Sequence, residues 1–193
     1  MSNKKSIAMI AAVCHNNGIG FEGRLPWRLK NEMSYFTRVT STSTDGKRNA
    51  VIMGRKTWQS IPPKFRPLVN RVNVVLSQTL SEVPKGADYL FPSLRQSIEV
   101  LSKDDSIDKM FVIGGQEVYK EAIDSNEFEY IYLTRIDGHF QCDAFFPEVD
   151  PKQFENITEE DKDIPQEVQE ENGLKYQFFL YKRFKWKVFY IFV

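Results

Sequence analysis

The sequence predicts an α/β fold with a mainly parallel central sheet, and two observations lead to this class. Short apolar runs recur along the chain, and such runs are typical of strands buried on both faces of a sheet. Stretches with helical spacing lie between several of these runs, as expected when crossover helices connect parallel strands. No repeat, low-complexity segment or linker interrupts the pattern, so we expect one domain.

Each element follows from its local pattern. The runs predicted as strands are Ile7 to Val13, Asn49 to Met53, Val72 to Leu76, Ala87 to Leu90, Met110 to Ile113, Tyr130 to Thr134 and Gln177 to Tyr181. The stretches predicted as helices are Leu29 to Thr40, Leu94 to Leu101 and Gln116 to Ile123, and a further helix is expected to begin after Gly54. The polar stretch from Glu159 ends in Asn172-Gly173, a turn signal ahead of the last strand.

Composition and charge exclude several classes of function. The 193 residues suffice for one core and one ligand site, and 26 basic residues balance 26 acidic ones. Electrostatics therefore implies neither a nucleic acid nor an anionic membrane as a partner. Cys14 and Cys142 lack metal-site spacing, His15 and His139 are isolated in the sequence, and the start of the chain lacks a signal peptide. We expect a cytoplasmic protein without a metal.

The C-terminal residues 184–193 (FKWKVFYIFV) are unusually apolar for the end of such a chain. About ten residues are too few to span a bilayer. A prolonged last strand or a disordered tail is one interpretation, and a segment that binds a partner or a membrane surface is the other. We expect a domain over residues 1–183 and an extension of unknown role over 184–193.

A glycine motif follows the first strand, because residues 18–23 (GIGFEG) satisfy the GxGxxG pattern of dinucleotide-binding Rossmann folds. In that fold the glycines open a helix, but Pro26 cannot continue one. The next strand also lacks the acidic residue that would hold a ribose. The segment is therefore interpreted as a loop that moves over a bound ligand.

A second glycine, Gly54, joins a strand to a helix start that carries Arg55 and Lys56. Free amides at a helix start and a bidentate arginine favour phosphate, and two adjacent cations suit NADPH better than NADH. An ordinary solvated pair of surface cations is the alternative. Gly114-Gly115 makes a similar strand-to-helix turn, where the backbone can lie close to a flat ring or a pyrophosphate.

Glu32 lies on the apolar stripe of its helix, together with Leu29, Met33 and Phe36. It should therefore project toward the sheet, and burial there would raise its pKa. The alternative is a surface glutamate paired with Arg28, four residues earlier.

In order and spacing, these segments resemble the dihydrofolate reductases of eukaryotes, from Ile7 to about Arg183. The glycine loop with Trp27, the Glu32 helix and the Gly54 turn each match a family motif. The other matching motifs are Ser60-Ile61-Pro62, Arg66-Pro67-Leu68 with Arg71, Val112-Ile113-Gly114-Gly115 with Val118-Tyr119, Leu133-Thr134-Arg135-Ile136 and Asp143-Ala144-Phe145-Phe146-Pro147. The resemblance implies an eight-stranded sheet with an antiparallel C-terminal strand and about four helices. It also implies NADPH-dependent reduction of 7,8-dihydrofolate, by hydride transfer to C6 and protonation of N5.

The resemblance assigns the catalytic roles to Glu32, Trp27, Thr134 and Leu25. Glu32 would hydrogen-bond the pterin and relay the proton through an ordered water near Trp27, while Thr134 braces its carboxylate. Arg71 would bind the carboxylate of the substrate's glutamate tail. The remaining residues implied for the substrate site are Met33, Phe36, Ser60, Ile61, Leu68, Ile113 and Tyr119.

For NADPH, the resemblance places Arg55 on the 2′-phosphate, with Lys56 and Thr57 near the pyrophosphate. The other residues implied for the cofactor site are Ala11, Ile19, Gly20, Gly23, Arg24, Leu25, Gly54, Leu76, Ser77, Gln78, Ile113, Gly114, Gly115, Gln116, Glu117, Val118 and Tyr119. The peptide bonds Gly114-Gly115 and Arg66-Pro67 are expected to be cis.

Some residues depart from the family pattern. Gln78 and Pro92 stand where many vertebrate members have arginines, so Arg55 would carry more of the preference for NADPH. Met33 replaces a phenylalanine and should make the site more plastic toward antifolate inhibitors. The alternatives are a reductase of the same fold that acts on another heterocycle and a non-catalytic binding paralogue. A monomer is expected.

Overall fold

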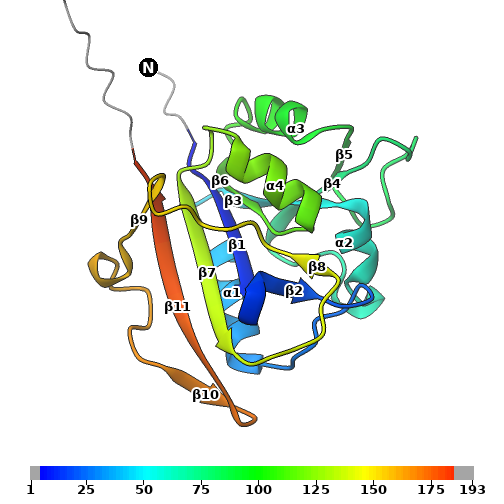
Figure 1. Ribbon diagram of the computed structural model, residues 1–193. Helices are drawn as coiled ribbons and strands as arrows, with labels where there is room; N and C mark the ends of the chain where they lie inside the picture. The colour runs from blue at the N-terminus through cyan, green and yellow to red at the C-terminus, as the bar shows by residue number, and fades with distance from the viewer. Residues whose placement is uncertain (1–4, 185–193) are drawn as a thin grey trace, which may run out of the picture.

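Strand β1 (Ile7–Val13) lies inside the sheet, as its uninterrupted apolar sequence predicts. It pairs in parallel with β6 (Ile107–Val112) on one side and with β7 (Tyr130–Asp137) on the other. From β6 the sheet continues, still in parallel, through β3 (Arg48–Gly54) and β4 (Arg71–Leu76) to β5 (Tyr89–Phe91). The computed structural model describes residues 5–184, and Figure 1 shows this sheet at its centre.

The C-terminal strand β11 (Leu174–Arg183) pairs antiparallel with β7, which confirms the predicted direction. Its other edge carries β10 (Gln169–Glu171) and β9 (Phe154–Asn156), also antiparallel. The continuous order is β10-β11-β7-β1-β6-β3-β4-β5, the predicted eight strands, and β9 is added beside β11. A separate ladder joins β2 (Gly18–Gly20) to β8 (Ala144–Phe145). The resemblance implied eight strands in all, but the local pattern predicted seven individual runs, and β2, β8, β9 and β10, with two or three residues each, were not among them.

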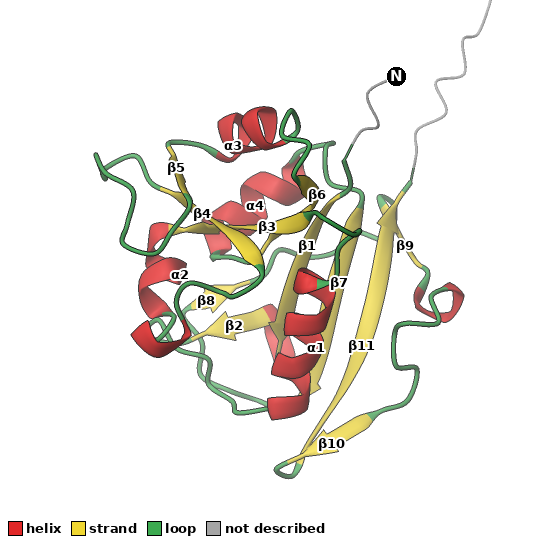
Figure 2. Cartoon of the chain, turned by 180° about the vertical axis from the view of Figure 1, so that it is seen from behind, coloured by secondary structure: helices red, strands yellow, loops and turns green. Residues whose placement is uncertain are grey.

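Helices cover both faces of the sheet, because alternate residues of a buried strand point to opposite sides. Ile7 and Met9 of β1 pack in one cluster with α3 (Leu94–Leu101) and α4 (Gln116–Asp124). Ala8 and Ile10 pack on the opposite face, where α1 (Lys30–Ser41) and α2 (Arg55–Ser60) lie. Figures 1 and 2 show α3 and α4 on one side and α1 on the other.

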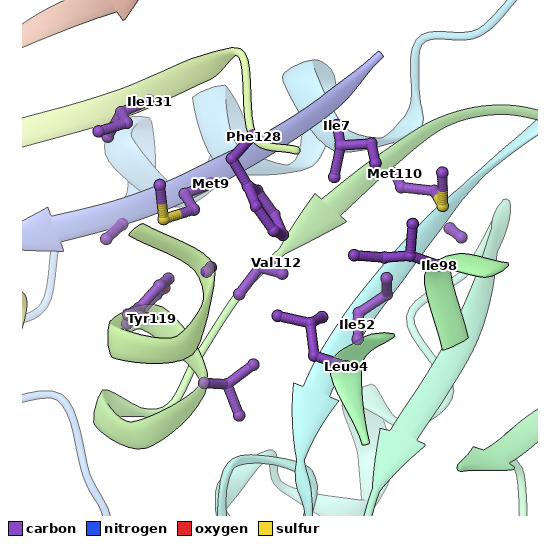
Figure 3. Packing of buried hydrophobic residues seen from close by; sticks show 14 of the residues in the cluster. Ile7, Met9, Ile52, Leu94, Ile98, Met110, Val112, Tyr119, Phe128 and Ile131 are labelled. Atoms are coloured by element: carbon purple, nitrogen blue, oxygen red, sulfur yellow. The ribbon is translucent and has the colours of Figure 1, made fainter. Parts of the chain in front are cut away.

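The larger core lies between the sheet and the pair α3 and α4, as Figure 3 shows. Side chains from β1, β3 and β6 meet Leu94 and Ile98 of α3 and Tyr119 of α4 in this core. Met9, Ile52, Met110 and Leu101 are almost fully buried. Truncating such a side chain to alanine lowers the free energy of unfolding by about 2–5 kcal/mol. The packing of this layer therefore stabilises the sheet on which the opposite face is built.

The predicted boundaries agree with the structure to within a few residues. α3 has the predicted ends, and α2 begins at Arg55, directly after Gly54. Short 3-10 turns add η1 (His15–Asn17), η2 (Pro63–Phe65) and η3 (Thr158–Glu160). Within residues 5–184, no helix has the length and apolar character needed to cross a membrane.

Most of the apolar C-terminal extension, residues 185–193, lies outside the described residues. Phe184, its first residue, is described: its amide donates a hydrogen bond of 2.9 Å to the carbonyl of Gln153.

Candidate active site

The carboxyl ends of the parallel strands meet at one edge of the sheet, where α/β proteins usually bind their ligands. The register pairs Gly54 of β3 with Leu76 of β4, and Ala12 of β1 with Thr134 of β7. The chain after β6 continues directly into Ile113 and the Gly114-Gly115 turn. The predicted cofactor turns and the predicted substrate residues therefore gather at the same edge.

Glu32 lies on α1 with only 6% of its surface exposed, and one of its carboxylate oxygens accepts a hydrogen bond of 3.1 Å from Thr134 Oγ1. Burial raises the pKa of Glu32 from 4.5 to about 7; the Thr134 hydrogen bond opposes the rise and the negative charge of Glu171 adds to it. The predicted inward position is confirmed, and the ion pairs within the described part of the chain do not include one between Glu32 and Arg28.

The buried face of α1 differs in one respect from the predicted stripe. Tyr35 is buried against Phe178, with ring centroids 3.9 Å apart, whereas Met33 is 44% exposed. The helix is rotated so that Glu32 and Tyr35 point inward together. The large apolar surface of the Tyr35 ring explains the rotation, since its burial gains more than that of the flexible Met33.

The start of α1 is held by the turn between β10 and β11. The Glu171 carboxylate accepts hydrogen bonds from the Lys30 amide at 2.7 Å and the Asn31 amide at 2.9 Å. Asn172 Nδ2 donates to the carbonyl of Arg28 at 2.8 Å. Leu29, at the N-cap position, provides no side-chain cap, so Glu171 satisfies amides that would otherwise lack a partner. The sequence indicated this turn through Asn172-Gly173, but not that it docks on α1.

Trp27 is buried ahead of α1, and its ring contacts Phe140 edge-on, with centroids 5.6 Å apart. Its Nε1 has no hydrogen-bond partner among residues 5–184. Buried polar atoms of this kind are usually satisfied by an ordered water or a ligand. The Trp27 Nε1 is therefore a donor available to a water molecule.

The predicted apolar wall divides into two groups. Phe36, Ile61, Leu68 and Ile113 are half-buried and pack against one cluster on the α1 face of the sheet. Leu25 is 50% exposed, and Ser60 is exposed with its hydroxyl bonded to the carbonyl of Thr57. The first group therefore belongs to one apolar cluster, while Leu25 and Met33 are among the exposed large hydrophobic residues.

Arg71 is a buried cation, 4% exposed, and it forms no ion pair within the described residues. Its Nη1 donates to Thr40 Oγ1 at 2.8 Å, its Nε donates to the carbonyl of Val69, and burial lowers its pKa. A buried guanidinium without a counter-charge suits an incoming carboxylate. No local sequence pattern predicted the hydrogen bond between Thr40 and Arg71.

The two glycine turns expected at the cofactor are bonded to each other, since the Gly54 amide donates to the Gly114 carbonyl at 2.9 Å. The bonds Gly114-Gly115 and Arg66-Pro67 are both cis, as predicted. A Cβ on Gly115 would lie 3.1 Å from Thr57 Oγ1, so the backbone passes close to the start of α2. Arg55 and Lys56 flank this point and form no ion pair within residues 5–184. A narrow glycine cradle beside two unpaired cations fits a pyrophosphate with an additional phosphate.

The remaining predicted cofactor residues surround this cradle. Leu76 is buried at the end of β4, the hydroxyl of Ser77 accepts the amides of Thr79 and Leu80, and Gln78 is exposed. The register of β3 with β4 pairs Gly54 with Leu76, the residues that directly precede Arg55 and Ser77.

On the other side of the cradle, the Tyr119 hydroxyl donates to the carbonyl of Ile10 at 2.7 Å, and burial raises its pKa. Gln116 accepts the amide of Phe145. Ala11 and Val118 are buried, Ile19, Gly20 and Gly115 are half-buried, and Gly23, Arg24 and Glu117 are exposed.

Two hollows in the described surface lie away from Glu32. One of about 410 Å³ lies between Gln116 and Phe154, and one of about 590 Å³ is lined by Arg55, Trp58 and Lys85 among others. Neither hollow is lined by Glu32, Thr134 or Arg71. The candidate active site is therefore identified from the hydrogen bonds and burial of these residues and not from the two hollows.

The histidines are not isolated in space. The rings of His15 and His139 stack with centroids 4.1 Å apart, and His15 Nε2 lies 3.2 Å from Asp137 Oδ1. Within residues 5–184, no group of three or more His, Cys, Asp or Glu is arranged to hold a metal ion.

Comparison with known proteins identifies the family, since the family model of dihydrofolate reductase matches residues 6–183. The chain belongs to the dihydrofolate reductase family. It is 47% identical to the dihydrofolate reductase of Gallus gallus, over 93% of this chain and 97% of the relative, and 45% identical to that of Sus scrofa, over 90% and 96%. The structure of Schistosoma mansoni dihydrofolate reductase is similar, with a TM-score of 0.81 and 38% identity, over 93% of this chain and 99% of that one.

Membership of the dihydrofolate reductase family defines the reaction class: the protein is an oxidoreductase that reduces dihydrofolate to tetrahydrofolate with NADPH. The single α/β domain and the mixed sheet are those of the family.

Proposed function

We propose that Glu32 is the residue on which reduction of dihydrofolate depends, by orienting the pterin and supplying the proton for N5. The observation that carries this proposal is a carboxylate with only 6% of its surface exposed, bonded to Thr134 and with its pKa raised to about 7. A carboxyl group with this pKa is present in both protonation states near neutral pH, as a proton relay requires.

Thr134 fixes the orientation of the carboxylate and leaves the second oxygen of Glu32 free for the substrate. Bidentate recognition of the pterin's amino group and ring nitrogen would set the face that receives hydride. Trp27 supports proton delivery, because its unpartnered Nε1 can hold a water beside the reacting ring. Leu25, half-exposed on the glycine loop, would exclude bulk water from this region.

Arg71 and the apolar wall would bind the rest of the substrate. Phe36, Ile61, Leu68 and Ile113 offer apolar contact to the rings, and Met33, Ser60 and Tyr119 complete the set of proposed substrate residues. Arg71, a buried cation without an ion-pair partner, would bind the glutamate carboxylate. An apolar surface with a carboxyl group at Glu32 and a cation at Arg71 suits a substrate with a flat polar ring at one end and a carboxylate at the other.

NADPH would supply the hydride when bound. We assign Arg55 to its 2′-phosphate and Lys56 and Thr57 to its pyrophosphate, with the amides of Gly115, Gln116, Glu117 and Val118 nearby. The cradle at Gly115 and the two unpaired cations support this assignment. The other residues assigned to the cofactor are Ala11, Ile19, Gly20, Gly23, Arg24, Leu25, Gly54, Leu76, Ser77, Gln78, Ile113, Gly114 and Tyr119.

We further propose that residues 1–183 form the catalytic domain of a cytoplasmic monomer that antifolates inhibit. The two free thiols suit a reducing compartment. Sedimentation of the full chain would test the oligomeric state, including any association through residues 184–193.

The test of the central proposal is NADPH oxidation on addition of dihydrofolate, measured for the wild type and Glu32→Gln. We expect the substitution to lower kcat by about 10²–10⁴-fold at pH 7, since a positioned proton donor contributes that much. The Glu22→Gln variant is a suitable control, because Glu22 is exposed and only its backbone amide is bonded, to Asp143. Full activity of Glu32→Gln would exclude the proposed role.

A further inference from the structure

The two cysteines of the chain are 128 residues apart in sequence and adjacent in space. Cys14 Sγ and Cys142 Sγ lie 3.7 Å apart, and both thiols are free. A disulfide requires a sulfur separation near 2.05 Å, so the two atoms have to approach by about 1.7 Å. That movement is of the size that small rotations of the two side chains supply.

The backbone at Gly18 packs directly against the two sulfur atoms. Gly18, in an extended conformation, lies directly over it, because a Cβ built there would come within 2.9 Å of Cys14 Sγ and 2.5 Å of Cys142 Sγ. Glycine is therefore required at this position by the two sulfurs and not by its backbone angles. The pair occupies the space that a side chain of the glycine loop would fill.

The two thiols differ in access. Cys14 is buried, with 4% of its surface exposed, while Cys142 is half-buried. A small oxidant can therefore reach Cys142 first, and Cys14 is placed to attack from the protein side. Burial and the adjacent Cys14 thiol raise the pKa of Cys142, so the exchange should accelerate as the pH rises.

The sulfur pair lies where the glycine loop is fastened to the segment 142–146. The Asp143 amide donates to the Gly20 carbonyl at 3.0 Å and the Phe146 amide to the Asn17 carbonyl at 2.8 Å, while the Cys14 amide donates to the Gly18 carbonyl within the first segment. The Asp143 carboxylate also accepts the Glu22 amide at 2.9 Å. A covalent bond at Cys14 and Cys142 would add to these hydrogen bonds and oppose separation of the two segments.

We propose that Cys142 and Cys14 form a thiol–disulfide exchange site, at which a small-molecule disulfide reacts and leaves an intramolecular bond that restrains the glycine loop. In the first step the Cys142 thiolate attacks one sulfur of the oxidant, forms a mixed disulfide and releases one small thiolate. In the second step the Cys14 thiolate attacks the Cys142 sulfur and releases the other. Two protein thiols are oxidised, one small disulfide is reduced to two thiols, and those thiols take up the two protons.

The test is to treat the full chain with oxidised glutathione at pH 8.5 and to measure its mass and its disulfide-linked peptides. We expect a loss of about 2 Da, a peptide pair that joins Cys14 to Cys142, and reversal by dithiothreitol. The Cys14→Ser variant should stop at a stable glutathione adduct on Cys142, about 305 Da heavier, and Cys142→Ser should react far more slowly. The proposal would be contradicted by a stable glutathione adduct on the wild type. It would also be contradicted if Cys14→Ser and Cys142→Ser reacted with oxidised glutathione at equal rates.

Limited trypsin digestion tests the restraint on the loop without using activity. Arg24 is an exposed cleavage point in the loop, and Lys85 is an exposed point in a distant one. Oxidation should slow cleavage after Arg24 several-fold and leave cleavage after Lys85 unchanged, because cleavage requires local opening. The oxidised protein should also melt roughly 5–15 °C higher. Equal rates of cleavage after Arg24 in the oxidised and reduced proteins would contradict the proposed restraint.

An effect of the disulfide on the release of NADPH is also expected, and this expectation rests on the proposed role of Ile19 and Gly20 in binding the cofactor. If these residues contact the nicotinamide, the oxidised protein should release NADPH several-fold more slowly than the reduced protein, as measured by stopped-flow fluorescence. Cys142→Ser treated in the same way is the control. A disulfide with unchanged release would refute the link to the cofactor, and the mass and digestion results would show separately whether the exchange site exists.

Discussion

The Thr134 hydroxyl donates a hydrogen bond of 3.1 Å to the Glu32 carboxylate, although the two residues are 102 positions apart. Both side chains are buried on the α1 face of the sheet, with Thr134 supplied by β7. The bond favours the ionised form of Glu32 and thus opposes the rise in pKa that burial causes.

Replacing Thr134 by valine should therefore raise the pKa of Glu32 further. The decrease of kcat/KM at alkaline pH should therefore occur at higher pH, because the Glu32 carboxyl group would stay protonated up to a higher pH. The KM for dihydrofolate should increase several-fold, because the Glu32 carboxylate would lose the hydrogen bond that orients it. Thr134→Ser keeps the hydroxyl and should retain the wild-type profile; a valine variant with that same profile would show that Thr134 does not act on Glu32.

The opposite shift is expected for Glu171→Gln. The negative charge of Glu171 raises the pKa of Glu32, so its removal should lower that pKa and move the decrease of kcat/KM to lower pH. The single amide oxygen of glutamine can keep one of the two hydrogen bonds to the start of α1, so folding should be retained. Within the described residues, Tyr35 on α1, Tyr119 on α4 and Tyr176 on β11 also interact electrostatically with Glu32. A tyrosine is neutral near pH 7 at its ordinary pKa, and burial raises the pKa of all three further, so they do not titrate in this range.

The matched control is Glu170→Gln, which removes the same charge from the neighbouring exposed position. Carbon-detected NMR of the Glu32 carboxyl, assigned from Glu32→Gln, would measure the shift without relying on turnover. An equal shift in Glu170→Gln would show that general surface charge, and not the contact at α1, controls Glu32.

The stability of the protein should depend on pH through Glu32. Its pKa is about 7 in the folded protein and 4.5 ordinarily, so the folded state binds more protons between these values. The stabilisation is complete below pH 4.5 and is lost as the pH rises through 7, by on the order of 3 kcal/mol. Urea unfolding at pH 5 and pH 8 should show this loss in the wild type and a smaller one in Glu32→Gln. Identical losses in the two proteins would assign the effect to other groups.

Arg55→Gln should raise the KM for NADPH by about 10–100-fold, because a charge-assisted contact to phosphate contributes about 1.5–3 kcal/mol. The KM for NADH should be almost unchanged, since that cofactor lacks the 2′-phosphate. The control is Arg95→Gln, which removes the charge of an exposed arginine on α3. Parallel increases for both cofactors would assign Arg55 to the pyrophosphate instead.

Thr40→Val should weaken substrate binding through Arg71. Thr40 Oγ1 accepts the Arg71 Nη1 hydrogen bond at 2.8 Å, and the buried guanidinium would lose this partner. We expect the KM for dihydrofolate to rise several-fold while the pH profile set by Glu32 stays constant. Thr37→Val, at an exposed position of the same helix, serves as the comparison. An altered pH profile in Thr40→Val would indicate a general disturbance of α1.

The sequence by itself determined the long elements and the kind of chemistry. The apolar run of β1 and the helical spacing of α1 depend on local side-chain patterns, so they can be recognised without a structure. The order of the motifs likewise sufficed to place Glu32, Arg55 and Gly114 in one family pattern, and the family comparison agrees with that pattern.

Only the tertiary structure decided how distant residues meet. The Glu171 contact with the start of α1 spans about 140 residues, and the approach of Cys14 to Cys142 spans 128. The exposure of Met33 and the burial of Tyr35 likewise depend on the rotation of α1 against β11. Such contacts are set by the packing of the whole sheet and its helices, because no local pattern specifies which surfaces of two elements face each other.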